Sequence, residues 1–455
     1  MKSQVTLPFV TGVYLAVNAV PNIALVVDGP DCLFHRADLI QGNHDWHATL
    51  LDVTGRHRVT NTFADVNTVV LDRSAILAEA IATLLARPSS AAVLVGALPV
   101  SYLTGVPYEA LVARFAGGAR PVLLLPRGSL SADWRGGYAA ALKALAEGLP
   151  LTPRDDTRAP GRVARVAVVG PMMHRNEGAG RGDVAELERL VAGLGLECVA
   201  VWPSGRPAAH LARAGAADLI VSLPYARAAA AALAARTGAR LVDAPLPVGL
   251  AGTAAFLAAV ARAADCEAAA RAFQEAEERR VAPLLEWVVP NAIVGRRVAL
   301  VAEPELATPL AAALRELGAQ VPLVAHLATF AREERPPDGR DPGRVSGRDP
   351  AVAREACALG GDDTAAEVQL ETDLVALEER CAVHHAAAPF SLALGNAFVL
   401  PVFHRVGIPF LEFGFPAHTE HALTLSPTLG YEGLLALVAR MVSRMELFAW
   451  LSEGR

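Results

Sequence analysis

Residues 23–35, IALVVDGPDCLFH, constrain the fold more than any other stretch of this 455-residue chain. The run Ile23–Val27 is short, apolar and rich in β-branched residues, which is typical of a strand buried on both faces. An Asp-Gly-Pro triplet stops this run, and from Cys32 to Ile40 the apolar spacing becomes helical. We therefore predict that Cys32 lies in the first turn of a helix, just beyond the carboxyl end of a strand. Unpaired backbone N–H groups and the helix dipole lower the pKa of a thiol there, and the thiolate is the form that attacks or binds metal.

Composition indicates a globular α/β protein, because 53% of the residues are hydrophobic and only 19% are charged. The length favours about three domains. A net charge of -6 argues against nucleic acid as a partner. The 5 cysteines are too scattered for a disulfide framework, so we expect a reducing, cytoplasmic location. Pro8, Asn18 and Pro21 interrupt the apolar N-terminus, so we expect neither a signal peptide nor a membrane span.

Short apolar runs alternate with helical patterns, which predicts βαβ units with mostly parallel sheets. We expect three Rossmann-like domains, at residues 1–155, 156–290 and 291–455, with a mobile, charged, Pro- and Gly-rich loop at 331–350. The predicted strands are Ile23–Asp28, Thr68–Leu71, Ala92–Val95, Pro121–Leu125, Val163–Val169, Cys198–Trp202, Leu219–Leu223, Arg240–Asp243, one within 296–304, Val321–Ala325, Ser391–Leu394 and Phe410–Phe413.

Helical patterns separate these strands. The longest, at 251–290, contains Pro283, which we expect to kink it or to divide it into two helices. The other predicted helices are Ser74–Leu85, Tyr108–Phe115, the region Cys357–Glu379 and Gly433–Leu447. Loops at the carboxyl ends of parallel strands usually carry the ligand site of such folds.

The other cysteines lie in apolar runs or beside helical patterns and lack CxxC spacing, so we interpret them as structural: Cys198, Cys266, Cys357 and Cys381. A lone cysteine such as Cys32 is itself more often a small buried hydrophobe than a ligand. A complete iron–sulfur site needs about four ligands. If Cys32 binds a cluster, the remaining ligands must therefore come from another chain.

Three close histidine pairs and one glycine-rich segment are weaker candidates. The pairs are His44 and His47, His384 and His385, and His418 and His421. An i, i+3 pair can bind zinc, but each pair lacks an obvious third ligand, and a polar loop or a satisfied core histidine is the alternative. Residues 178–182 do not have the spacing of a dinucleotide-binding loop, and the chain has neither a Walker-type loop nor a G-x-S-x-G elbow.

Several segments, spread over nearly the whole chain, together resemble the motifs of a known family. They are DGPDC at 28–32, GPMMHRN at 170–176 followed by GDVAEL at 182–187, PVGLAGT at 247–253, GIPFLEFGFP at 407–416 and LGYEG at 429–433. In this order they resemble the component 1 superfamily of nitrogenase-like oxidoreductases. That superfamily includes the two large nitrogenase subunits, the nitrogenase cofactor-assembly scaffold, and the dark-operative protochlorophyllide and chlorophyllide reductases.

The sequence departs from the family pattern at the cluster ligands. The family's first domain supplies three cysteines, but residues 8–12 contain none and Leu98 stands at a second cysteine position, so only Cys32 remains. This pattern is similar to the β-type subunits of the chlorophyllide reductase and of the scaffold, where one thiol completes a cluster held by the other subunit. The protochlorophyllide β-type subunit uses an aspartate instead, so Asp28 and Asp31 are alternatives. It also carries a C-terminal domain without a counterpart in this sequence.

The resemblance implies a nitrogenase component 1-like fold and a β-type subunit of an oxidoreductase complex, with Cys32 as the fourth ligand of an intersubunit [4Fe-4S] cluster. An α-type subunit would supply the other cysteines, and a separate ATP-dependent iron–sulfur reductase would supply electrons that pass to a substrate between domains. A cofactor-assembly scaffold subunit and a cluster-free structural or binding subunit are the alternatives. We expect His174, His418 and His421 nearest the inter-domain cleft, because each follows a strand end.

Overall fold

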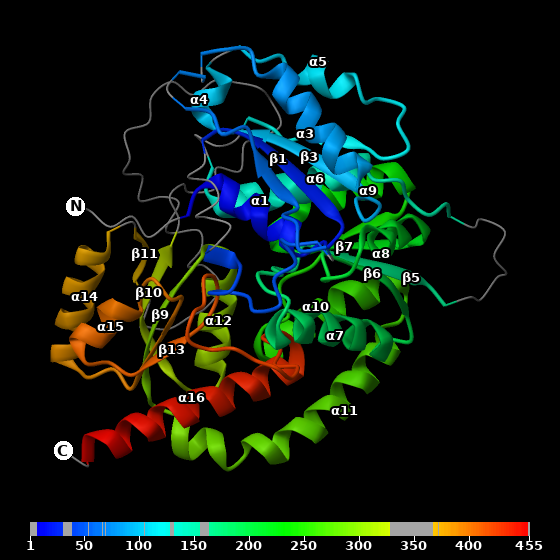
Figure 1. The fold of residues 1–455 in the computed structure, drawn as a ribbon. Helices are drawn as coiled ribbons and strands as arrows, with labels where there is room; N and C mark the ends of the chain where they lie inside the picture. The colour runs from blue at the N-terminus through cyan, green and yellow to red at the C-terminus, as the bar shows by residue number, and fades with distance from the viewer. Residues whose placement is uncertain are drawn as a thin grey trace, which may run out of the picture.

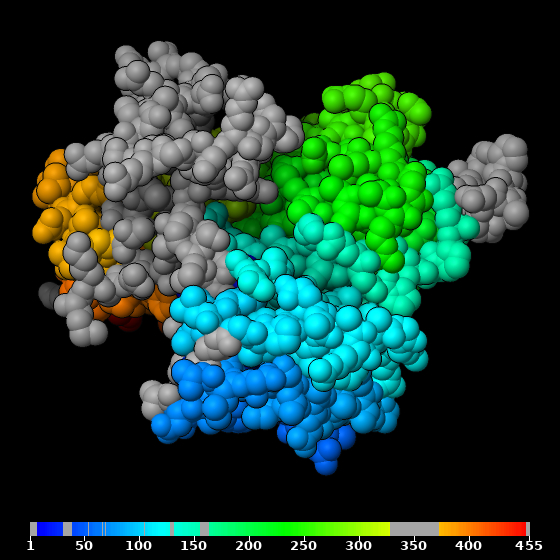
Figure 2. Space-filling view, turned by 90° about the horizontal axis from the view of Figure 1, so that it is seen from above, coloured from blue at the N-terminus to red at the C-terminus, as the bar shows by residue number. Residues whose placement is uncertain are grey.

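The computed structural model describes residues 7–30, 39–52, 54–65, 67–68, 70–103, 105–127, 132–154, 163–327, 367–371 and 373–453. These residues form three sheets in which all paired strands are parallel, with helices packed against them (Figure 1). The prediction of an α/β fold with parallel sheets is confirmed. Seen from above, the three parts form separate lobes, the first blue and cyan, the second green and the third orange (Figure 2).

The first sheet has the strand order β2-β1-β3-β4, and its central strand β1 is buried along its whole length. Its strands are β1 (Ile23–Asp28), β2 (Val59–Asn61), β3 (Ala92–Ala97) and β4 (Val122–Leu124). Its helices are α1 (Phe9–Asn18), α3 (Ser74–Ala86), α4 (Pro99–Tyr102), α5 (Tyr108–Ala113) and α6 (Trp134–Gly148). Cys32, Asp31 and most of the helix predicted after β1 lie outside the described residues.

The predicted strand Thr68–Leu71 is wrong, and β2 takes its place in the sheet. Residues 67, 68, 70 and 71 form a turn and a bend instead. The Oδ1 atom of Asp65 accepts hydrogen bonds from the backbone N–H groups of Asn67 and Thr68, at 3.0 and 2.8 Å. Such a carboxylate-capped turn competes with extended backbone, so a short apolar run is not sufficient for a strand here.

The second sheet has the order β6-β5-β7-β8. Its strands are β5 (Arg165–Val169), β6 (Glu197–Trp202), β7 (Leu219–Ser222) and β8 (Arg240–Asp243). The helical segments around it are α7 (Gly178–Gly193), α8 (Ala208–Ala212), η2 (Arg213–Ala216), η3 (Pro224–Ala226), α9 (Arg227–Thr237), α10 (Gly249–Ala264), α11 (Glu267–Leu285) and η4 (Val289–Ile293).

The long helical pattern at 251–290 forms two helices, but they do not divide at Pro283. Asp265 adopts a left-handed conformation with φ 53° and ends α10, and α11 then begins at Glu267. A non-glycine residue in this conformation breaks the helical backbone. Pro283 lies inside the last turn of α11, where the helix ends at Leu285.

The third sheet has the order β11-β10-β9-β12-β13. Its strands are β9 (Arg297–Ala302), β10 (Gln320–Leu327), β11 (Glu367–Glu371), β12 (Leu392–Gly395) and β13 (Phe410–Glu412). Its helices are α12 (Pro304–Glu316), α14 (Leu374–Ala387), α15 (Leu400–Val406) and α16 (Gly430–Glu453). The predicted helical region Cys357–Glu379 is therefore wrong at 367–371, where the chain pairs with β10. The loop predicted at 331–350 lies outside the described residues.

Helices α1, α6 and α9 form a layer between the first and second sheets (Figure 1). A Cβ atom at Gly12 would lie 1.6 Å from the carbonyl oxygen of Trp134, and one at Gly137 would lie 1.8 Å from that of Phe9. The crossing of α1 and α6 therefore requires glycine on both helices. Each sheet lies within one predicted domain range, but the boundaries themselves stay a prediction. Among the described helices, none has the length and apolar character needed to span a membrane.

Candidate functional site

The carboxyl end of β1, from which the chain continues toward Cys32, is held by a buried network around Asp28. The Oδ1 atom of Asp28 accepts hydrogen bonds from Arg73 Nε at 2.8 Å and from Thr62 Oγ1 at 2.6 Å. Its Oδ2 atom accepts from Arg73 Nη2 at 2.8 Å and from the Tyr108 hydroxyl at 2.5 Å. The side chains of Asp28 and Arg73 are 0% and 1% exposed, so solvent does not screen their ion pair.

Burial alone would raise the pKa of Asp28, but hydrogen bonds from Arg73, Thr62 and Tyr108 outweigh it and hold this pKa below its ordinary value. Asp28 is therefore an ionised carboxylate. A carboxylate has about four lone-pair sites, and four donors already occupy those of Asp28. A metal bond at Asp28 would have to displace one of them.

The thiols that the structure describes lie in unfavourable places for metal binding. Burial raises the pKa of Cys198, on β6, to about 12. Burial also raises the pKa of Cys266, at the start of α11, and Cys381 is buried in α14. These positions agree with the structural role predicted for the three residues, whereas Cys357 lies outside the described residues. Leu98, at the second family cysteine position, packs against the core.

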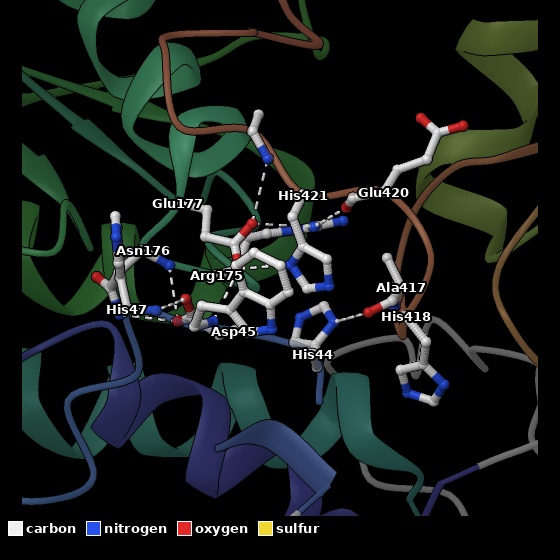
Figure 3. A network of polar contacts seen from close by, with 12 residues as sticks. His44, Asp45, His47, Arg175, Asn176, Glu177, Ala417, His418, Glu420 and His421 are labelled. Carbon is white, nitrogen blue, oxygen red and sulfur yellow. Dashed lines mark hydrogen bonds and ion pairs between the residues drawn. The ribbon is translucent and has the colours of Figure 1, made fainter. Parts of the chain in front are cut away.

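A second polar network lies where segments from all three sheets meet (Figure 3). His44 precedes β2, His174 follows β5 and Ala417 follows β13. The Nε2 atom of His44 lies 2.8 Å from the carbonyl oxygen of His174 and 3.2 Å from His174 Nδ1. Its Nδ1 atom lies 2.9 Å from the backbone nitrogen of Ala417 and 3.0 Å from the carbonyl oxygen of the same residue. Each ring nitrogen therefore has a donor and an acceptor within reach, and either neutral tautomer of His44 is fully bonded.

Burial keeps His44 and His174 uncharged. Together with the nearby Arg175 cation, it lowers the pKa of His44 to about 3. Burial also places the pKa of His174 well below its ordinary value. Neither ring is therefore an imidazolium near neutral pH, and we assign to His44 the role of a link between the three parts of the fold.

Asp45 extends the network towards α1. Its Oδ2 atom accepts hydrogen bonds from Asn18 Nδ2 and from the backbone N–H of Asn176, both at 2.8 Å. Asn176 Nδ2 in turn donates to the carbonyl oxygen of Asn18 at 3.1 Å. All three side chains are buried, so their hydrogen bonds tie α1 to the loop after β5.

Glu177 joins the same loop to the third sheet. Its Oε1 atom accepts from the backbone N–H of Trp46 and contacts His421 Nδ1, both at 2.8 Å (Figure 3). The rings of Trp46 and His421 stack with their centroids 3.9 Å apart. Burial raises the pKa of Glu177, but the Trp46 N–H and His421 bonds outweigh it and lower this pKa overall.

The structure separates the three histidines predicted near a cleft. His174 and His421 both belong to the network, whereas His418 faces Phe398, with ring centroids 6.5 Å apart. The backbone N–H of His418 donates to Glu412 at 2.8 Å, and its Nε2 atom has no hydrogen-bond partner among the described residues. Their catalytic roles stay a prediction.

Aromatic side chains pack against one another in the described part of this junction. The Phe415 ring lies 4.8 Å from the His44 ring and 5.1 Å from the Trp134 ring, measured between centroids. The cavity that Trp134, Glu303 and Phe415 help to line has a volume of only about 10 Å³, which is room for about one water molecule. Nor do the described residues contain a group of three or more His, Cys, Asp or Glu side chains that could hold a metal ion. Among the described residues, no third ligand of these types accompanies any of the three histidine pairs.

Several motif segments singled out in the sequence meet at a further junction. Asp183 Oδ1 accepts from the backbone N–H groups of Thr428 and Leu429, at 2.6 and 3.0 Å, and Glu186 Oε1 accepts from that of Tyr431 at 3.0 Å. A Cβ atom at Gly178 would lie 1.8 Å from the carbonyl oxygen of Thr424, so this position requires glycine. GDVAEL is thus part of α7, and its carboxylates bind the start of α16, where LGYEG lies.

Sequence reasoning missed the residues that complete both networks: Asn18, Asp45, Arg73, Asn176, Glu177 and Glu412. Two of them carried a local indication, since Asp45 and Glu177 stand beside or near histidines in predicted loops. Arg73 had none, because its partner Asp28 lies 45 positions away in the sequence.

Known proteins resemble this chain in sequence and in fold. The family model described as nitrogenase component 1 type oxidoreductase matches residues 10–446. The B subunit of the light-independent protochlorophyllide reductase of Methylobacterium sp. (strain 4-46) is 30% identical over 270 residues, which cover 58% of this chain and 47% of that protein. Its counterpart in Rhodospirillum rubrum is 27% identical over 396 residues, which cover 83% of this chain and 65% of that protein.

A solved structure of nitrogenase Cp1 at pH 6.5 has the same fold, with a TM-score of 0.73 over 98% of this chain and 93% of that one. At 16% identity, this likeness concerns the fold alone. The chain spans about half the length of several of the curated relatives that it matches, 47% in the case of the Methylobacterium protein.

Proposed function

This chain belongs to the nitrogenase component 1 type oxidoreductases, and from this premise we propose that it is a β-type subunit of a nitrogenase-like reductase. In this proposal Cys32 supplies one thiolate to a [4Fe-4S] cluster that an α-type partner holds with its own cysteines. A separate ATP-dependent iron–sulfur reductase supplies the electrons, in a cytoplasm that keeps thiols reduced. When bound, such a cluster accepts and passes on electrons.

The number of available ligands is the observation that carries the proposal. The described residues offer no group of three or more metal ligands, and Cys198, Cys266 and Cys381 stand apart in β6, α11 and α14. Cys32 follows the central strand of the first sheet in sequence, where a ligand site of a parallel sheet is expected. No described thiol lies near another metal ligand, so in this proposal a cluster with about four ligands needs a partner.

Asp28 is a less suitable ligand than Cys32, because four hydrogen bonds already use its carboxylate. Asp31, like Cys32, lies outside the described residues and stays an alternative. In our proposal the donors around Asp28 hold the strand end that leads to the ligand, and they do not take part in electron transfer.

The packing of the three-part junction bears on where a substrate is reduced. Phe415 packs beside His44 and Trp134, and the cavity lined by Trp134, Glu303 and Phe415, with about 10 Å³, is too small for an organic substrate. We therefore propose that reduction takes place in a space shared with the α-type partner. The reductase names of the curated relatives favour this activity over that of an assembly scaffold.

Dependence of iron loading on the partner tests the proposal. The chain would be produced anaerobically, alone and together with a three-cysteine α-type partner, and each preparation would be analysed for iron, sulfide and visible absorption. We expect stoichiometric iron only in the complex. A colourless, iron-free complex would support a cluster-free subunit, and full loading of the chain by itself would contradict a shared cluster.

A further inference from the structure

The last turns of α16 extend beyond the hydrophobic core. Earlier in this helix only one face is buried, and its residues follow a spacing of three and four positions: Leu434, Leu437, Val438 and Met441. Every residue from Glu446 to Leu451 is exposed, and residues 447–451, LFAWL, are all apolar. Successive side chains of a helix point about 100° apart, so these five surround the helix end. A helix that is apolar on all sides is usually buried, whereas this one faces solvent.

The end of α11 and the following η4 lie beside α16 (Figure 1) and are also apolar at their surface. Leu284 lies in the last turn of α11, and Trp287 follows it. The backbone on both sides of Trp287 is helical, so these two side chains, three positions apart, point to the same side. We call the six exposed side chains at the two helix ends the α16 patch: Leu284, Trp287, Leu447, Phe448, Trp450 and Leu451.

The α16 patch is large enough to form a stable interface. Trp287, Trp450 and Phe448 are 75%, 71% and 39% exposed. At about 150–250 Å² for a fully covered aromatic side chain, these three offer about 300–450 Å². This is close to half of the roughly 800 Å² that each partner of a stable interface buries, and the three leucines add to it. Monomeric proteins rarely expose such a patch, and tryptophan contributes more than most residues to binding energy.

The charges beside the α16 patch suit a second copy of this chain. Glu446 on α16 and Glu286 next to Trp287 are exposed carboxylates, whereas Arg296, which follows η4, is an exposed guanidinium. A two-fold axis places a surface opposite itself in reverse orientation. A patch that carries both signs at its edge can therefore meet its own copy with unlike charges opposite each other, which favours specific association.

We propose that the α16 patch is the contact surface of a homodimer of this chain. The end of α16 in one copy packs against the end of α11 in the other, about a two-fold axis. In such a contact every patch residue occurs twice, so one substitution removes two side chains from the interface. The contact involves neither the cluster nor the α-type partner of the proposed function.

Sedimentation equilibrium of the purified chain over a wide range of concentration tests this inference. We expect the wild type to form a dimer, and Trp450→Ser and Trp287→Ser to raise its dissociation constant at least about tenfold each, as loss of a central tryptophan typically does. Leu423→Ser is the matched control. It removes an apolar side chain that is 80% exposed, in the loop after β13 and outside the α16 patch, and should keep the dissociation constant of the wild type.

Circular dichroism checks that the variants fold, and both tryptophan variants should retain the spectrum of the wild type because their side chains lie outside the core. A wild-type chain that stays monomeric would overturn the inference, as would equal dimerisation of the tryptophan variants and Leu423→Ser. If the chain is monomeric and the tryptophan variants instead fail to bind the α-type partner, the patch belongs to that partner. The proposed function fails separately, if Cys32→Ala retains its iron.

Discussion

The uncharged ring of His44 connects segments from three parts of the fold at the junction. Its Nε2 atom contacts the carbonyl oxygen of His174, which follows β5, and its Nδ1 atom contacts the backbone of Ala417, which follows β13, so one residue links three parts of the fold. A protonated ring would place a charge where solvent does not reach it, near the Arg175 cation. The folded chain therefore favours the uncharged ring.

This arrangement predicts a loss of stability in mild acid. The pKa of His44 is about 3 in the folded chain, against an ordinary value of 6.5, so the unfolded chain takes up the proton first as pH falls. The contribution of His44 to stability is therefore complete above pH 6.5 and decreases as pH falls below it. Denaturant unfolding at a series of pH values should show a steeper decrease for the wild type than for His44→Asn, which cannot titrate at this site.

The exposed His404 provides the control, because His404→Asn removes a histidine from α15 that is exposed to solvent. We expect its pH dependence to match that of the wild type. If His44→Asn lost stability in acid as steeply as the wild type, the neutral ring would not be what the fold requires.

The start of α16 depends on carboxylates from another helix. Asp183 and Glu186, both on α7, accept from backbone N–H groups at the start of α16 and just before it, which would otherwise have no partner. The N–H of Gly430 also donates to the carbonyl oxygen of Pro247 at 2.6 Å. The second and third parts of the chain are thereby joined at one helix terminus.

Asp183 predicts a pH effect of opposite sign to that of His44. Burial raises its pKa from 3.8 to about 7, so the folded chain binds the proton more tightly than the unfolded chain. The contribution of this group to stability is complete below pH 3.8 and is lost as pH rises through 7. Between pH 5 and 8 the stability of the wild type relative to Asp183→Asn should therefore decrease by at most about 1.4 kcal/mol per pH unit.

Asp243→Asn, an exposed change on β8, is the control for this measurement and should show no such trend. A constant difference between the wild type and Asp183→Asn over the same range would show that Asp183 is ionised throughout.

The elements themselves were largely predictable, because buried parallel strands such as Ile23–Asp28 are continuous apolar runs. The wrong strand predictions in the first sheet have local causes. β2 has three residues and no apolar run, and Asp65 turned the run at Thr68–Leu71 away from the sheet. The networks could not be predicted, because His44 and its partner Ala417 are 373 positions apart and no local pattern connects them.

At the scale of the whole molecule, the described residues form three parallel sheets, and side chains pack where these sheets meet. The central strand of the first sheet ends at Asp28. The cavity beside Trp134 and Phe415 has room for about one water molecule, and no described thiol belongs to a group of metal ligands. In the proposed function, the stretch that follows β1 is what the chain presents to a partner. For this reason we propose a subunit that completes a cluster and does not hold one by itself.

Replacement of Cys32 tests this proposal most directly. Cys32→Ala and the control Cys381→Ala, which removes a buried thiol of α14, would each be co-purified anaerobically with the α-type partner. Iron content and the electron paramagnetic resonance spectrum of the reduced complexes would then be compared with those of the wild type. We predict that Cys32→Ala loses iron or changes the spectrum of the cluster, while Cys381→Ala preserves both. A Cys32→Ala complex with the iron content and spectrum of the wild type would contradict it.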